Sequence, residues 1–261
     1  MISVKFAIKT AVFISIILIS TFMHFKHFNK DLVSIHVWRQ TQTQSTINNF
    51  YEESMDIMKP LRNKRGNNDG VFRMEFPLMQ WLVACLYKAF GNHLILSRLF
   101  MFICGLLSVA GIYKLLKNVF SNELIALMGC WAFNFSPTFY YHTINPLPDN
   151  FALTMAIWGL VFFFIYYKTN KTFYVFLSGT SIAIAALCKL PFIIYFIVPM
   201  VHFSIRIFKT KPKGKSLLDF ALCMIPALMP LAWYVSVIPE WGENIIIKGV
   251  VDKSENAFGY I

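Results

Sequence analysis

Three charged residues border long apolar stretches of the chain. Asp149 lies in the proline-rich turn 145–150, Glu75 precedes Phe76-Pro77, and Lys189 follows an apolar run. A carboxylate at such a position can act as a general base or cap the helix that follows. Glu75 could also bind a metal or interact with the dipole at a helix start. Lys189 could contact a phosphate or extend its ammonium group toward water.

A second group of polar and aromatic residues follows the first apolar stretch. It consists of His36, Trp38, Arg39 and Gln40, followed by Gln42 and Gln44, which alternate with Thr41, Thr43 and Ser45. Trp and Arg are common anchors at a membrane boundary, whereas glutamines in a polar loop offer hydrogen bonds suited to a sugar. His142 precedes Asp149 by seven residues, and its ring could pack against neighbours or contact a ligand.

The sequence contains none of the short motifs that mark several common enzyme classes. It has no glycine-rich phosphate loop, no HExxH motif and no GxSxG serine elbow. The five cysteines form no CxxC pair, so neither a zinc site nor a disulfide framework is indicated. These features argue against an ATPase, a membrane zinc protease and an α/β hydrolase, and no metal ligands are predicted.

The composition indicates which kind of element must position these residues. Of the 261 residues, 57% are hydrophobic and 14% are charged, and the mean hydropathy is +0.55. A soluble protein of this size could not bury so much apolar surface, and a disordered chain would be far less hydrophobic. We therefore predict an all-α membrane protein that forms a single polytopic domain over residues 1–261.

About seven spans can be drawn if each needs roughly 20 apolar residues. They cover 6–25, 98–120, 123–143, 150–167, 172–188, 190–208 and 217–237. With the N-terminus in the cytoplasm, three turns that contain Lys and Arg fall on the cytoplasmic side, within 114–117, 168–171 and 206–215, as the positive-inside rule requires. The net charge of +11 then reflects topology, and nucleic acid is not an expected partner.

The segment 26–76 is a long first outer loop in this topology. Five of its residues have the spacing of one helix face: Ile47, Phe50, Tyr51, Ser54 and Met58. This spacing predicts a helix that lies in the membrane interface and stops at Pro60. Residues 77–91 predict a further helix, which is too short for a full span and is therefore re-entrant or interfacial. Residues 238–261 form a mostly polar outer tail.

The order of these features resembles the GT-C polytopic glycosyltransferases. The closest likeness is to glycosyltransferase family 39, which includes protein O-mannosyltransferases and the lipid A aminoarabinose transferase. The residues that carry it are Trp38-Arg39-Gln40, the run from Asn49 to Asp56, Pro60, the run from Glu75 to Leu82, Phe90-Gly91, Arg98, Ser136-Pro137, Pro148-Asp149 and Leu187-Cys188-Lys189. The resemblance covers about residues 6–235 and implies the seven-helix core of the GT-C fold. Relatives commonly continue further, so the tail is expected to begin a C-terminal part.

The resemblance implies a concrete reaction. A sugar moves with inversion from a polyprenyl-phosphate donor to a lipid, glycan or protein acceptor, at the outer face of the plasma membrane and without a nucleotide sugar. In this family an acid in the first outer loop acts as the base, and basic residues stabilise the leaving phosphate. This sequence has Gln42 in the region of that acid, and Glu75 where relatives have a phosphate-binding lysine.

The residue patterns and the resemblance together give the candidate site residues. The catalytic candidates are Asp149, Glu75 and His36. The candidates for binding the donor phosphate are Lys189, Arg73, Arg39 and Arg62. Contacts to the sugar or the acceptor are expected from Trp38, Gln40, Gln42 and His142.

Two other functions stay open. The first is a transporter or flippase of lipid-linked sugars, which the scarcity of polar residues near the predicted helix centres argues against. The second is a non-catalytic, truncated GT-C module, which the missing loop acid and the short chain favour.

Overall fold

The computed structural model describes residues 2–32, 36–63, 69–209 and 214–243. In this part of the chain the regular secondary structure is helical, apart from an isolated β-bridge between Leu61 and Val71. Five segments are long and apolar enough to cross a membrane: Ala7–Phe25, Leu94–Phe120, Pro148–Thr169, Leu190–Lys209 and Gly214–Trp241. The prediction of an all-α membrane protein is confirmed.

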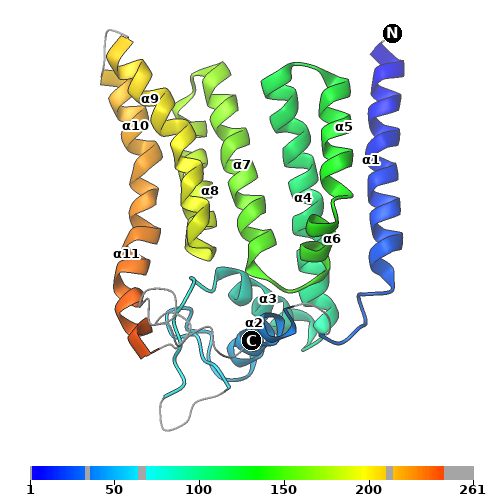
Figure 1. Ribbon diagram of the computed structural model, residues 1–261, viewed down its shortest axis with the longest axis vertical. Coiled ribbons are helices and arrows are strands. Elements are labelled where there is room, and N and C mark those ends of the chain that lie inside the picture. Colours follow the sequence, from blue (N-terminus) through cyan, green and yellow to red (C-terminus); the bar gives the residue numbers. More distant parts are fainter. Residues whose placement is uncertain (1, 33–35, 64–68, 210–213, 244–261) are drawn as a thin grey trace, which may run out of the picture.

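The helices that form the upright array are α1 (Ile2–Phe25), α4 (Leu94–Phe120), α5 (Glu123–Asn134), α6 (Pro137–Ile144), α7 (Pro148–Thr169), α8 (Thr172–Cys188), η1 (Leu190–Phe196), α9 (Ile197–Lys209), α10 (Gly214–Met224), η2 (Ile225–Ala227), α11 (Leu228–Val237) and η3 (Ile238–Glu243). Two further helices, α2 (Val37–Glu52) and α3 (Leu78–Phe90), lie across one end of this array (Figure 1). We call this end the loop end.

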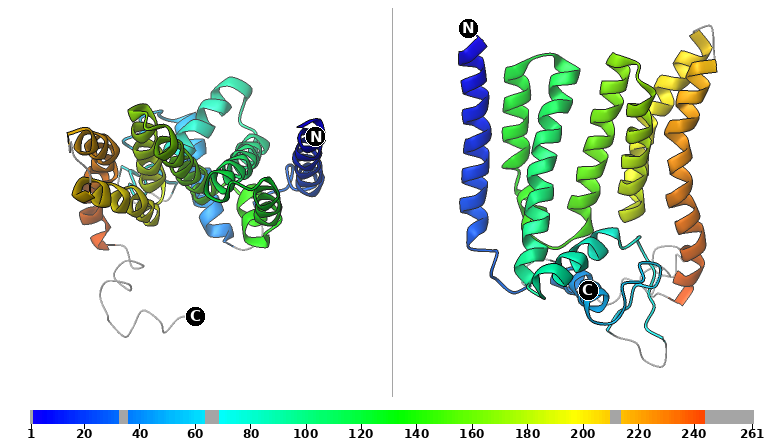
Figure 2. Two further views of the ribbon diagram at one scale, coloured as in Figure 1. Left: turned by 90° about the horizontal axis from the view of Figure 1, so that it is seen from above. Right: turned by 180° about the vertical axis from the view of Figure 1, so that it is seen from behind.

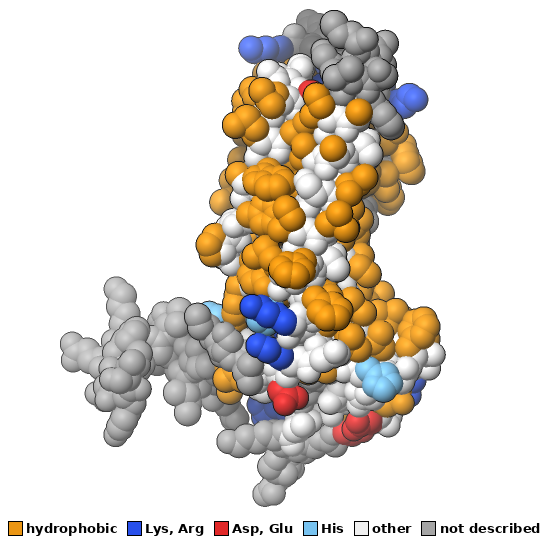
Figure 3. Space-filling view, turned by 90° about the vertical axis from the view of Figure 1, so that its right-hand side faces the viewer, with side chains coloured by type: hydrophobic (Ala, Val, Ile, Leu, Met, Phe, Trp, Pro, Cys, Tyr) orange, Lys and Arg blue, Asp and Glu red, His pale blue; other side chains and the backbone are white. Residues whose placement is uncertain are grey.

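Successive long helices run in opposite directions, so the chain returns repeatedly to the loop end (Figures 1 and 2). The turns between α4 and α5 and between α7 and α8 lie at the opposite end of the array, which is also the end with the N-terminus. In the space-filling view, hydrophobic side chains cover the middle of one face, and charged side chains lie toward its two ends (Figure 3). This arrangement matches an apolar belt for lipid between two aqueous ends.

Two of the seven predicted spans, the third and the fifth, are not among the five segments long enough to cross a membrane, although α8 has the predicted bounds of the fifth. The third is interrupted at Phe135 and Ser136, which separate α5 from α6. Pro137 explains the break, because proline disfavours a helical conformation in the residue before it and lacks a backbone N–H. The fifth span, α8, has 17 residues and ends at Cys188.

The first outer loop contains a helix, but its bounds differ from the prediction. The expected helix face extended to Met58, whereas α2 ends at Glu52. The chain turns back after α2, and the Asn49 side chain donates a hydrogen bond to the carbonyl of Leu61 in the returning segment at 3.0 Å. The glutamine and threonine run belongs to α2 as well, so it is not an extended polar loop. Of the predicted tail, residues 244–261 lie outside the described residues.

Close helix packing fixes the relative height of the helices that end at the site. A side-chain Cβ on Gly179 of α8 would collide with the backbone of Cys223 in α10. Thr154 of α7 donates a hydrogen bond to the Cys104 carbonyl of α4 at 3.0 Å and lies 2.8 Å from the Ser108 hydroxyl. Small residues and hydroxyl groups are the usual means of holding membrane helices together, because lipid supplies no hydrophobic force between them.

Arg98 holds the turn that leads into α7. It is 3% exposed, and its Nη1 donates to the Ile144 carbonyl at 2.6 Å. Its Nη2 donates to the carbonyls of Lys30 and Asp31, each at 2.9 Å. One guanidinium therefore joins the segment after α1, the start of α4 and the end of α6, which is possible because it presents several donors in a fixed plane.

Candidate functional site

Glu75 and Arg39 form an ion pair at the loop end. The Arg39 Nη2 atom lies 2.6 Å from both carboxylate oxygens of Glu75. The two side chains are 25% and 17% exposed, so the pair is partly shielded from water. Arg39 comes from the first turn of α2, whereas Glu75 comes from the segment that precedes α3. The pair therefore ties α2 to the segment before α3.

The segment that carries Glu75 is held by residues far from it in sequence. The indole nitrogens of Trp233 and Trp241 donate to the carbonyls of Met74 and Arg73, each at 2.9 Å. The Phe76 N–H donates to the Leu187 carbonyl at 3.0 Å. These bonds place the carboxylate beside the C-terminal end of α8.

Lys189 lies between Glu75 and a second carboxylate. Its Nζ is 3.2 Å from Oδ1 of Asp149 and 3.7 Å from Oε1 of Glu75. It directly follows the last residue of α8, and Asp149 occupies the first turn of α7. Arg39, Glu75, Lys189 and Asp149 thus form a continuous row of alternating charge, which we call the charged row. Its formal net charge is zero.

The two carboxylates of the charged row differ in how many of their oxygens have partners. Both oxygens of Glu75 are in contact with Arg39, and one also lies near Lys189. The contact between Asp149 and Lys189 involves Oδ1, and no group in the described part of the chain donates a hydrogen bond to Oδ2. Asp149 is 31% exposed, so this oxygen can accept a proton from a molecule that enters the site.

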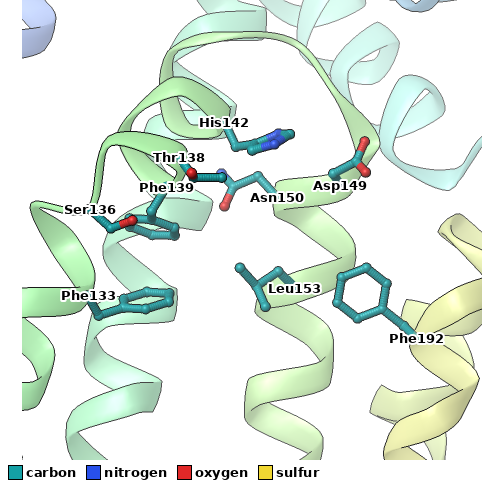
Figure 4. Close-up of a pocket in the computed structure, with 9 residues that line it drawn as sticks. All are labelled: Phe133, Ser136, Thr138, Phe139, His142, Asp149, Asn150, Leu153 and Phe192. Atoms are coloured by element: carbon teal, nitrogen blue, oxygen red, sulfur yellow. The ribbon is translucent and has the colours of Figure 1, made fainter.

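Asp149 also lines a cavity of about 350 Å³ (Figure 4). The lining residues are Phe133, Ser136, Thr138, Phe139, His142, Asp149, Asn150, Leu153 and Phe192. They come from α5, the break before α6, α6 itself, α7 and η1. The interruption of the third span therefore contributes directly to the cavity, because an unbroken helix would carry Ser136 and Thr138 on a regular surface.

Two residues that line the cavity each have a buried polar atom without a hydrogen-bond partner among the described residues. The two atoms are Oδ1 of Asn150 and Nδ1 of His142. Asn150 is fully buried, and its other amide atom, Nδ2, donates to the Met101 carbonyl at 2.8 Å. Buried polar groups in proteins are nearly always paired, so unpaired atoms that line a cavity indicate a polar ligand or water.

The remaining candidates lie in three other places. His36 and Gln40 both adjoin Tyr141, with ring centroids 6.2 Å apart for His36 and an Nε2 to hydroxyl distance of 3.3 Å for Gln40. Trp38 is 59% exposed at the start of α2, and Gln42 is half-buried one turn after Arg39. None of these four side chains belongs to the charged row.

Two of the expected phosphate-binding residues are separate from the charged row. Arg73 pairs with Glu240, with Nε 3.0 Å from Oε2, and lines a second cavity of about 440 Å³. The Arg62 guanidinium lies over the Phe72 ring, 4.6 Å from its centroid. Within the described residues no group of three or more His, Cys, Asp or Glu side chains could hold a metal ion.

A comparison with protein families identifies the chain. A family model described as dolichyl-phosphate-mannose-protein mannosyltransferase matches residues 75–234, which is more than half of the sequence. The chain belongs to this family. No curated protein and no solved structure matches it significantly. Membership confirms the likeness to GT-C enzymes and indicates a membrane glycosyltransferase of the mannosyltransferase type.

The part matched by the mannosyltransferase family includes most of the site. It begins at Glu75 and contains Asp149, Lys189 and every residue that lines the cavity of Asp149. Arg39 precedes it, so the structure rather than the family match connects α2 to the site. Sequence analysis missed Asn150. Its only signal was its place directly after Asp149 in the proline-rich turn.

Proposed function

We propose that this chain is an inverting glycosyltransferase. It would take a sugar from a polyprenyl-phosphate donor and transfer it to a lipid, glycan or protein acceptor at the outer face of the plasma membrane, with its N-terminus in the cytoplasm. The observation that carries the proposal is the charged row, whose member Asp149 also lines a cavity, in a chain of the mannosyltransferase family.

In this proposal Asp149 is the general base. Transfer to a hydroxyl group requires removal of its proton as the bond to the sugar forms. Asp149 has an oxygen without a partner in the described part of the chain, and this residue lines the cavity. Glu75 is the weaker candidate, because Arg39 occupies both of its oxygens. His36 adjoins Tyr141 instead of the charged row.

Lys189 and Arg39 supply the positive charge for the phosphate. Their side chains are 29% and 25% exposed, so an anion can reach both without unfolding the site. A phosphate at Lys189 would draw its ammonium group away from Asp149, while Glu75 keeps it in place from the other side. Binding of the donor would then free Asp149 to act as a base, and the same cations would stabilise the leaving phosphate.

The cavity suits a lipid that carries a polar head group. The side chains of His142, Asp149 and Asn150 lie at one end of it, and those of Phe133, Leu153 and Phe192 lie nearer the other (Figure 4). Leu153 is one helical turn beyond Asp149 on α7, toward the middle of the array. The polar part is therefore at the loop end, and the apolar part points toward the depth at which lipid chains would lie.

The direct test uses purified protein in lipid nanodiscs with radiolabelled polyprenyl-phosphate mannose and a mixture of candidate acceptors. The wild-type chain should release polyprenyl phosphate and form a labelled product. Asp149→Asn should reduce transfer by about 100-fold or more, because general-base catalysis contributes on that order. Asp56→Asn is the matched control. Asp56 is an exposed carboxylate that caps the Met58 N–H at 3.0 Å, so its variant should keep wild-type activity.

The outcomes separate the proposal from its competitors. Normal transfer by Asp149→Asn would remove this residue from the mechanism. Binding of the donor without any product would favour a non-catalytic module. Movement of labelled donor across a vesicle membrane, without a new covalent product, would favour a flippase.

A further inference from the structure

Asn150 lines the cavity, and only one of its two side-chain amide atoms has a hydrogen-bond partner among the described residues. It is fully buried in the first turn of α7, and one half of its amide group is used for packing, because Nδ2 donates to the Met101 carbonyl of α4. This bond fixes which atom is nitrogen and which is oxygen. The oxygen Oδ1, which has no partner among the described residues, belongs to a residue that lines the cavity (Figure 4).

His142 lines the same cavity and also has an unpaired buried atom. Its Nδ1 is buried and has no partner within the described part of the chain. His142 belongs to α6 and Asn150 to α7, so the two residues line the cavity from different helices. Leaving a buried polar atom without a partner costs stability, and in native structures such atoms usually pair with protein groups or ordered water.

Few kinds of ligand group could form hydrogen bonds with both atoms. Asn150 Oδ1 can only accept a hydrogen bond, whereas the histidine nitrogen can accept or donate one depending on its tautomer. A hydroxyl group can meet either requirement. A hydrocarbon chain can meet neither, although the apolar residues deeper in the cavity would suit one. The volume of about 350 Å³ falls in the usual range for small-molecule sites.

We infer that Asn150 and His142 are specificity residues that bind hydroxyl groups of the transferred sugar. The inference rests on the proposed function, since it assigns the polar end of the cavity to the sugar of the lipid-linked donor. Asp149 adjoins Asn150 in sequence and lines the same end, so a sugar held by these residues lies beside the base. Each residue would then discriminate against a sugar that lacks its hydroxyl partner, because that sugar leaves the atom unpaired.

The test compares polyprenyl-phosphate mannose with a set of its monodeoxy analogues. For the wild-type protein, removal of the hydroxyl that binds Asn150 should lower kcat/KM by about tenfold, the usual effect of one buried hydrogen bond. In Asn150→Ala the same analogue should react within about twofold of the parent donor. His142→Phe, which keeps an aromatic ring, should remove the penalty for a different analogue. Each result is the ratio of kcat/KM for a deoxy donor to kcat/KM for the parent donor, measured on the same variant. A smaller fraction of folded protein lowers both values equally and therefore does not change the ratio.

Asn134→Ala is the matched control. Asn134 is also buried, and its Nδ2 donates to the Ser20 hydroxyl at 2.8 Å, but it does not line the cavity. This variant should keep the wild-type preference between parent and deoxy donors. If the wild-type protein treats all monodeoxy donors alike, or if Asn150→Ala keeps the full wild-type preference, the inference is wrong and the unpaired atoms are satisfied by water alone.

Equilibrium binding of the same donors in nanodiscs separates this inference from the proposed function. If no donor supports transfer but one deoxy analogue binds about tenfold more weakly, and Asn150→Ala removes that difference, the sugar site stands and the catalytic proposal fails. If transfer occurs without any such difference in binding or turnover, the catalytic proposal stands and the sugar site fails.

Discussion

Replacement of Arg98 by methionine tests whether one buried guanidinium holds the loop end together. Arg98 donates to the carbonyls of Ile144, Lys30 and Asp31, and it is 3% exposed. Methionine occupies similar space but cannot donate, so Arg98→Met leaves these carbonyls without their partner. The turn that carries Asp149 begins directly after Ile144, and the variant should therefore affect both stability and activity.

The size of the stability effect can be estimated from these contacts. A hydrogen bond from a charged donor contributes about 1.5–3 kcal/mol, so the three bonds together contribute about 4–9 kcal/mol. Burial of the guanidinium costs several kcal/mol, and methionine does not carry that cost. We expect a net loss of about 3 kcal/mol, which corresponds to a fall in Tm of about 6–12 °C for a chain of this size.

The assay is thermal unfolding of the purified protein in one detergent, followed by intrinsic fluorescence, with donor turnover measured in parallel. Arg73→Met is the matched control for stability. Arg73 pairs with Glu240 where both side chains are partly exposed, at 29% and 42%, so its loss should cost less than about 1 kcal/mol. Arg98→Lys should fall between wild type and Arg98→Met, because lysine keeps the charge without the planar donors. Equal Tm values for Arg98→Met and wild type would refute the reasoning.

Two further predictions concern helix packing. Gly179→Ala should destabilise the protein by about 2 kcal/mol in the same assay, since the added methyl group meets the backbone of Cys223, which cannot move like a side chain. Gly214→Ala should be close to neutral, because its added Cβ has no neighbour within 4 Å among the described residues, and a destabilisation as large as that of Gly179→Ala would contradict this account. Gln44→Leu should cost about 1–3 kcal/mol by leaving the Tyr87 and Ser97 hydroxyls without the amide that now lies 2.9 and 3.0 Å from them. An unchanged unfolding midpoint in urea would count against that network.

The sequence predicted the fold best where local signals were sufficient. The second and fourth spans were predicted within a few residues of α4 and α7. A long apolar segment in a membrane must form a helix, because its backbone polar groups have no water to bond to. The break before Pro137 was missed, although proline supplied a local signal for it. The helix α2 was harder, because its polar residues are buried by partners far away in sequence. Gln44 contacts Tyr87 and Ser97, and no local pattern shows such contacts.

The sequence showed which charged residues of the candidate site lie at helix ends. It did not show which of them contact one another. Asp149 and Lys189 were recognised because each borders an apolar helix, which requires no knowledge of packing. Their separation of 3.2 Å depends on the relative height of α7 and α8. The position of Glu75 depends on Trp233, which follows it by more than 150 residues. These arrangements follow from tertiary structure, so the sequence alone left the roles of the charged residues open.

The neutrality of the charged row explains how such a site can exist at a membrane surface. An isolated charge that is partly removed from water is costly, whereas alternating charges stabilise one another. Each inner member of the row has two oppositely charged neighbours, and each outer member has one. In the proposed reaction, a phosphate that arrives with its own negative charge would take Lys189 from Asp149 without leaving the lysine unpaired, because Glu75 would retain it. The row would then exchange one anionic partner for another, and the carboxylate that it would release is the one that lines the cavity.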